Sequence, residues 1–224
     1  KGFSSNQLSR ILGVTLKTAW FMSHRIREAM RDDVLPPLGG AGKVVEADET
    51  YIGRMANSEP SPQRKGRPYV HPNRPARKRA VVSLVERGGK VRSFHVENAD
   101  KATVTNIVNE NIRRESRIHT DESRLYNDVK GTFAAHETVH HSSGEYARGD
   151  VNTNTVEGFF SVFKRGMIGV YQHCAEKNLH RYLSEFDFRY NNRVKLGVND
   201  AMRADIALQG IVGKRLTYRT TARG

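Results

Sequence analysis

The sequence predicts an α/β protein with a mixed five-stranded sheet and flanking helices, preceded by a small helical segment. After residue 40, the hydrophobic periodicity indicates three strands, then a helix, a strand, a helix, a strand and a helix, followed by a last long helix. Before residue 40, two short amphipathic stretches are separated by Gly13. Hydrophobic residues make up 37% and charged residues 27% of the 224 positions, which suits one full-sized core plus a small appendage.

The N-terminal stretch is expected to form two helices within residues 4–30, with Ser4 or Ser5 capping the first and Thr15 the second. This is helix-turn-helix spacing, although an ordinary helical hairpin packed on the main domain is the alternative. The second helix would bury one apolar face, made of Leu16, Ala19, Trp20 and Ile26. Its other face would offer DNA the basic residues Lys17, Arg25 and Arg27.

Composition divides the chain into a DNA-binding segment at 1–35, a linker at 36–42, a main domain at 43–195 and a tail at 196–224. The linker is predicted by residues that do not continue a helix, namely Pro36, Pro37, Gly39 and Gly40. Within the main domain, residues 53–78 hold five of the seven prolines and form a basic loop. This loop is either a solvated insertion or a DNA contact through Arg64, Lys65 and Arg67.

The main domain is expected to contain five strands and four helices. The predicted strands are residues 43–50, two in a hairpin over 79–96, 117–120 and 137–141. The predicted helices are residues 101–114, one from about 123, 153–165 and 176–193. The last helix repeats apolar residues at helical spacing, which predicts core packing by Leu179, Leu183, Phe186 and Tyr190.

Three carboxylates are expected to meet at one edge of this sheet. Asp48 is expected at the end of the first strand and Asp121 at the end of the fourth. Glu157 is expected on the helix after the fifth strand. Because the first and fourth strands are neighbours in this topology, the three side chains can converge. Oxygen ligands of this kind suit Mg²⁺ or Mn²⁺, and two such ions can promote phosphoryl displacement without a protein nucleophile.

The spacing of these acids is the most specific sequence signal. Thirty-five residues separate Asp121 from Glu157, and Lys164 follows Glu157 by seven positions, two helical turns along one face. Four blocks then resemble bacterial DDE-type insertion-sequence transposases of the ISXO2-like group. They are ADETYIG at 47–53, TDE at 120–122, NTNTVEGFFS at 152–161 and YLSEFDFRYN at 182–191.

The resemblance implies a ribonuclease H-like domain that cuts DNA at insertion-sequence ends and joins the freed 3′-hydroxyl to target DNA. It implies Asp48, Asp121 and Glu157 as ligands of two Mg²⁺ or Mn²⁺ ions. Some relatives have asparagine where the third ligand is expected, so Asn154 is the rival ligand or a neighbour of the ligands. Family members usually begin with a zinc ribbon. Since this sequence starts at Lys1 without one, it is expected to be a fragment.

Several neighbouring residues have two interpretations each. Glu49 and Glu122 should face away from the ions, because adjacent strand residues point to opposite faces. His140 and His141, expected at the end of the fifth strand, are either structural or assist with phosphate or proton transfer. Two basic residues that follow on the helix of the third acid are expected to contact DNA phosphates, namely Lys164 and Arg165.

Charge and composition limit the class of function. The net charge of +13 favours a polyanionic partner, DNA in the form of terminal inverted repeats and target. Cys174 alone excludes an internal disulfide, and the absence of an 18-residue apolar run predicts a cytoplasmic, nucleoid-associated protein without membrane contact. An active complex of at least two copies is expected. A non-catalytic helix-turn-helix regulator and a nuclease that only hydrolyses are the alternatives.

Overall fold

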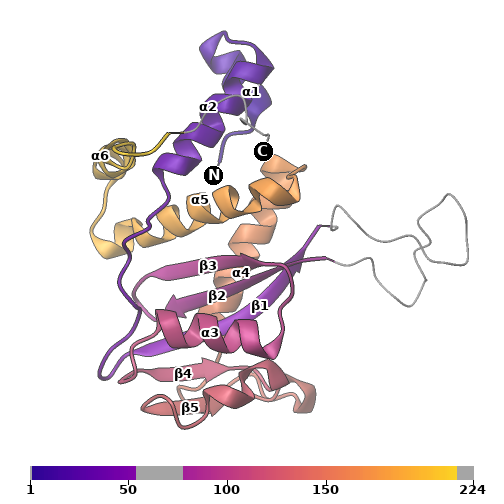
Figure 1. Ribbon diagram of the computed structural model, residues 1–224, viewed down its shortest axis with the longest axis vertical. Coiled ribbons are helices and arrows are strands. Elements are labelled where there is room, and N and C mark those ends of the chain that lie inside the picture. The colour runs from indigo at the N-terminus through magenta and orange to yellow at the C-terminus, as the bar shows by residue number, and fades with distance from the viewer. Residues whose placement is uncertain (1, 54–77, 216–224) are drawn as a thin grey trace, which may run out of the picture.

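The computed structural model describes residues 2–53 and 78–215, and a five-stranded mixed sheet forms its centre (Figure 1). The strands lie in the order β3-β2-β1-β4-β5. Their bounds are β1 Val44–Ile52, β2 Arg79–Glu86, β3 Val91–Val96, β4 Arg117–Thr120 and β5 Ala135–Thr138. Strands β1, β2 and β3 are antiparallel, whereas β4 runs parallel to β1 and to β5. This topology confirms the predicted fold class, a ribonuclease H-like α/β sheet.

Both faces of the sheet are covered, which explains why β2 has an almost continuous apolar sequence. Val82 and Leu84 pack into a core with α3, which spans Lys101–Asn111. Val81 and Val85 point the other way, into a second core with two helices. These helices are α4, Asn154–Gly166, and α5, Leu179–Asn191. The predicted core residues Leu179, Leu183 and Phe186 belong to this second core, and Tyr190 packs against it.

The N-terminal helices have the predicted boundaries and caps. Helix α1 spans Ser5–Leu12 and α2 spans Leu16–Ala29. The hydroxyls of Ser4 and Thr15 accept hydrogen bonds from backbone N–H groups in the first turn of each helix. Gly13 ends α1 with φ of 64°, a left-handed conformation in which glycine is favoured.

The predicted apolar face of α2 is wrong in three of its four positions. Ala19 is fully buried, but Leu16, Trp20 and Ile26 are 42–50% exposed. The reason is that α2 packs against α5 through a different face, in which Ser23, His24 and Arg27 are buried. In Figure 1, α1 and α2 stand at the end of the molecule away from β5, with α5 between them and the sheet.

Other segments also differ from the expected pattern. The stretch predicted as a linker packs on the sheet domain, where Leu38 is 3% exposed and pairs with Ile112. The helix expected from about residue 123 is a short 3₁₀ turn, Arg124–Val129. The segment expected as a tail contains helix α6, Asp200–Gln209. None of the described helices is both long and apolar enough to cross a membrane.

The outer edge of β3 is closed by side chains of α5. Asn191 accepts a hydrogen bond from Val91 N and donates one to Val91 O, at 2.7 and 2.9 Å. One turn earlier, Asp187 accepts bonds from Ser93 N and Ser93 Oγ, both at 2.7 Å. At Val91 and Ser93, the backbone of this edge strand is therefore satisfied by a helix where another strand would otherwise pair.

Candidate active site

Asp48 on β1 and Asp121, which directly follows β4, lie level with each other. The parallel register pairs Val44 with Arg117 and Glu46 with His119, so the same offset brings Asp48 beside Asp121. Asp48 is not at the end of β1, as the sequence predicted, because β1 continues to pair with β2 as far as Ile52. It lies instead where β4 ends and β1 loses its neighbour on that side.

The two aspartates are held in the same way. Oδ1 of Asp48 accepts a hydrogen bond from Glu49 N at 2.7 Å, and Oδ1 of Asp121 accepts one from Ser123 N at 3.0 Å. Burial, together with the negative charges of Glu49, Asp121 and Glu157, raises the pKa of Asp48 to about 8. Burial also raises the pKa of Asp121.

Glu157 reaches the same region from the first turn of α4, which packs on β1 and β2. Its Oε1 accepts a hydrogen bond from Thr153 Oγ1 at 2.7 Å and lies 3.5 Å from His141 Nε2. The side chain of Glu157 is 47% exposed, so it has room to change rotamer. The negative charge of Glu157 contributes to the raised pKa of Asp48, which indicates that the two acids lie in the same region.

The three acids fit a divalent metal by their chemistry. Their donors are carboxylate oxygens, which hard cations such as Mg²⁺ and Mn²⁺ prefer, and a cation would offset the repulsion that adds to burial in raising the pKa of Asp48. In residues 2–53 and 78–215, however, no three His, Cys, Asp or Glu side chains are grouped closely enough to hold one ion. The contact of Glu157 with Thr153 keeps its carboxylate turned toward its own helix.

Asn154, the predicted rival of Glu157, occupies a different side of α4. It is exposed and lines a hollow of about 440 Å³ between α4 and α5, together with Gly158, Phe159 and Tyr190. Glu157 instead contacts Thr153 and His141, on the side of the aspartates. The amide and the carboxylate are therefore not interchangeable in this arrangement.

Glu49 and Glu122 each have hydrogen-bond partners of their own. Glu49 accepts a hydrogen bond from the hydroxyl of the buried Tyr126 at 3.0 Å, in the core on the α3 face. Glu122 accepts bonds from the backbone N–H groups of Ser142 and His141, both at 2.8 Å. These bonds, led by that from Ser142, lower the pKa of Glu122 to about 2. Glu122 thus fixes the loop that carries His141.

The predicted place of the two histidines is wrong, because β5 ends at Thr138 and both histidines follow it. His141 begins a 3₁₀ turn, His141–Ser143, and its Nε2 lies 3.3 Å from Thr153 Oγ1. His140 contributes to this turn through its carbonyl, which accepts a bond from Ser143 Oγ at 2.9 Å. Within the described part of the chain, His141 is the one of the two that contacts a predicted acid, Glu157.

The predicted DNA-binding residues fall into three groups: exposed residues, residues outside the described part of the chain, and the buried Arg27. Lys17, Arg25, Lys164 and Arg165 are exposed, the first two on α2 and the others at the end of α4. Three others lie outside the described residues, namely Arg64, Lys65 and Arg67.

Arg27 does not fit the role in DNA binding that the sequence predicted. It is 4% exposed, and its Nε donates to Glu185 Oε2 at 2.8 Å. Its guanidinium also lies over the rings of Tyr171 and Tyr182, at 4.9 and 4.1 Å from their centroids. Arg27 therefore fastens α2 to α5, and a phosphate cannot reach it in this packing.

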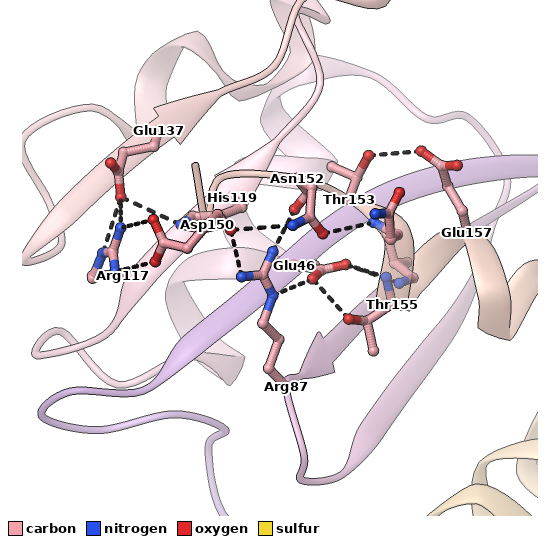
Figure 2. Close-up of polar contacts among 12 residues, drawn as sticks. Glu46, Arg87, Arg117, His119, Glu137, Asp150, Asn152, Thr153, Thr155 and Glu157 are labelled. Atoms are coloured by element: carbon pink, nitrogen blue, oxygen red, sulfur yellow. Dashed lines mark hydrogen bonds and ion pairs between the residues drawn. The ribbon is translucent and has the colours of Figure 1, made fainter. Parts of the chain in front are cut away.

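Sequence reasoning missed Glu46, a fully buried carboxylate two residues before Asp48 on the same face of β1. Figure 2 shows Glu46 between the guanidinium of Arg87 and the first residues of α4. The signal that could have found it is an acid within the buried strand sequence VVEADETYI, since a buried charge requires a partner.

The sheet order and the acids on β1, β4 and α4 define a ribonuclease H-like protein with a carboxylate site at the junction of β1 and β4. The family follows from the sequence profile of the ISXO2-like transposase domain, which matches residues 37–191. The chain belongs to this family, as the four sequence blocks predicted.

Two relatives carry names from mobile elements. An "Uncharacterized protein in transposable element ISH50" from Halobacterium salinarum is 30% identical over 199 residues, covering 83% of this chain and 64% of the relative. The chain thus spans slightly less than two thirds of that relative. An "Uncharacterized transposase-like protein" from Haemophilus influenzae is 26% identical over 103 residues, 46% of this chain and 82% of the relative.

Among solved structures, the chain is similar to complexes of the Mos1 transposase. The Mos1 strand transfer complex gives a TM-score of 0.40 at 14% identity, covering 96% of this chain and 75% of that one. The Mos1 mariner paired-end complex with Mn gives 0.28 at 12% identity, covering 85% and 73%. Since these scores are low, the fold is defined by the strand order alone.

Proposed function

We propose that this protein is a DNA transposase that cuts at insertion-sequence ends and joins the freed 3′-hydroxyl to target DNA. Asp48, Asp121 and Glu157 would hold two divalent ions, Mg²⁺ or Mn²⁺. The observation that carries the proposal is the level position of Asp48 and Asp121 across β1 and β4, beside the helix that bears Glu157. Membership in the ISXO2-like family supports it.

The chemistry requires no nucleophile from the protein. When bound, the two ions would activate the attacking oxygen and stabilise the leaving oxygen of an in-line phosphoryl displacement. The aspartates would each offer Oδ2 while their Oδ1 atoms keep the backbone bonds from Glu49 and Ser123. Glu157 would give up its bond from Thr153, whose hydroxyl then remains within reach of His141 Nε2.

We assign the third ligand to Glu157 and not to Asn154. A carboxylate binds a hard cation more strongly than an amide does. Glu157 also contacts Thr153 and His141, whereas Asn154 lines the hollow between α4 and α5.

DNA would be bound by both parts of the protein. We propose residues 1–35 as the segment that recognises terminal inverted repeats, through Lys17 and Arg25 on the exposed side of α2. Residues 43–195 would form the catalytic domain, where Lys164 and Arg165 hold phosphates near the acids. Joining two DNA ends implies at least two copies in the active complex, acting at the nucleoid in the bacterial cytoplasm.

The test is incubation of the protein with labelled insertion-sequence ends, target DNA and Mg²⁺, comparing wild type, Asp121→Ala and Asp128→Ala. Asp128 is a matched control, because it is an exposed aspartate in a surface ion pair with Lys101. Joined products are expected with wild type and Asp128→Ala, and none with Asp121→Ala.

Two other outcomes would favour the alternative functions. Cut ends without joined products would indicate a nuclease that only hydrolyses. Binding of ends with no cleavage by any of the three proteins would indicate a non-catalytic DNA-binding regulator and would contradict the proposal.

A further inference from the structure

The first turn of α4 is capped by a residue from the sheet. A helix start leaves several backbone N–H groups without partners inside the helix. Thr153 occupies the N-cap position but makes no capping bond, since its hydroxyl donates to Glu157. Glu46 on β1 takes over this function: its Oε2 accepts bonds from Thr155 N at 2.7 Å and Val156 N at 3.0 Å.

The carboxylate of Glu46 is held on its other side as well. Oε1 accepts a bond from Thr155 Oγ1 at 2.8 Å and one from Arg87 Nε at 2.5 Å. The remaining nitrogens of Arg87 donate to the carbonyls of Asp150 and Asn152, at 2.6 and 2.8 Å. Figure 2 shows that Glu46 and Arg87 together hold the strand, the loop before α4 and the start of α4.

This network determines the position of Glu157 relative to Asp48. Glu46 and Asp48 lie on the same face of β1, two residues apart, so their separation is set by the strand itself. Glu157 follows Thr155 by two residues in the first turn of the helix that Glu46 caps. A shift at the start of α4 would therefore move the third acid away from the first.

We propose that Glu46, supported by Arg87, is a positioning residue that keeps Glu157 opposite Asp48 for metal binding. This inference rests on the metal site proposed above. It differs from an ordinary helix cap in its consequence: loss of the Glu46 charge should weaken the contribution of Glu157 to metal binding, beyond any loss of stability.

The test measures Mn²⁺ binding from the decrease of the free-ion EPR signal. Wild type is compared with Glu46→Gln, Glu157→Gln and the double variant. We expect Glu46→Gln to weaken Mn²⁺ binding about 10- to 100-fold, as for other residues that orient metal ligands. In the Glu157→Gln background, the same change should have almost no further effect, because the two residues act on one ligand.

The matched control is Glu137→Gln, which alters the neighbouring ion pair between Arg117 and Glu137 (2.6 Å). It should change Mn²⁺ binding less than about threefold, since this pair does not contact α4. Amide hydrogen exchange without metal gives a second readout. Thr155 N and Val156 N should exchange faster in Glu46→Gln and at the wild-type rate in Glu137→Gln.

A second variant covers the case in which Glu46→Gln does not fold. Thr155→Val removes only the hydroxyl bond to Glu46 Oε1 and should weaken Mn²⁺ binding by a smaller factor. Wild-type Mn²⁺ binding in Glu46→Gln, or in Thr155→Val where Glu46→Gln does not fold, would overturn the inference. So would independent, multiplying effects of Glu46→Gln and Glu157→Gln. If Asp121→Ala leaves Mn²⁺ binding unchanged, the proposed metal site fails and this inference fails with it.

Discussion

Two acids on the same face of β1 are used in opposite ways. Glu46 is fully buried and its carboxylate accepts four hydrogen bonds, from Arg87 Nε, Thr155 N, Thr155 Oγ1 and Val156 N. Asp48, two residues later, accepts one backbone bond, and its burial together with the neighbouring carboxylates raises its pKa to about 8. The hydrogen-bonding capacity of the Glu46 carboxylate is satisfied within the protein, whereas the Asp48 carboxylate lies among other negatively charged groups.

The difference indicates what each acid contributes. A carboxylate with four donors gains nothing from a cation, and its removal exposes partners that were arranged around it. A carboxylate among other carboxylates destabilises the folded protein unless a cation is present. Groups that repel one another in the folded protein are common at binding and catalytic sites. The following predictions test this contrast.

The largest effect is expected from Asp48→Asn. It keeps the shape of the side chain but removes the charge that would bind an ion, so strand joining should fall by about 10³-fold or more, several kcal/mol of transition-state stabilisation. The measurement is the rate of joined-product formation with saturating Mg²⁺. Activity within tenfold of wild type would show that Asp48 is not a ligand.

Glu46→Ala should cause the largest loss of stability. It leaves Arg87, whose side chain is 24% exposed, without its carboxylate partner and leaves α4 uncapped. Breaking a buried ion pair in this way costs about 3 kcal/mol, the lower end of the usual range because Arg87 is partly solvated. Urea unfolding followed by circular dichroism would measure the loss. A loss below about 1 kcal/mol would mean that Glu46 is no more important than a surface acid.

The pH dependence of stability should reveal Asp48 in protein treated with a chelator. In the unfolded chain its carboxyl loses its proton near the ordinary pKa of 3.8, but in the folded protein only near 8. Between these values the folded state binds more protons, so stability falls as pH rises, by at most about 1.4 kcal/mol per pH unit. Unfolding between pH 5 and 8 should show this slope in wild type and a smaller one in Asp48→Asn. Equal slopes would contradict the assignment.

The smallest effect is expected from Glu137→Ala. Glu137 pairs with Arg117 at a half-buried position, with side chains 31% and 34% exposed, and its Oε2 lies 3.3 Å from Nε2 of the buried His119. Arg117 keeps its second partner, Asp150, at 2.8 Å. The loss should therefore be below about 1 kcal/mol by urea unfolding. A loss as large as that of Glu46→Ala would remove the contrast between the buried and the half-buried pair.

Local signals accounted for much of the fold. The caps Ser4 and Thr15, the hairpin of β2 and β3, and the boundaries of β4 depend on residues close in sequence. The assignment of Asp121 and Glu157 as metal ligands, which rests on their spacing, stays a prediction. Family membership confirmed the resemblance that these motifs indicated.

Tertiary contacts decided what the sequence could not. The buried face of α2 is chosen by α5, through Glu185, which lies 158 residues after Arg27. The role of Glu46 depends on Thr155, 109 residues later. In neither case does a periodic pattern identify the partner, since a basic residue on a helix and an acid on a strand each have many possible neighbours.

The closed edge of β3 restricts how copies of this protein can associate. Sheets commonly extend by backbone pairing at an open edge, and the same reaction leads to aggregation. A strand from another molecule could join at β3 only by displacing Asn191 and Asp187, that is, by detaching part of α5. Because α5 also holds α2 through Glu185, such a joining would loosen the N-terminal helices as well. Assembly through β3 would thus disrupt the packing of α5 and of the N-terminal helices in the protomer that joins.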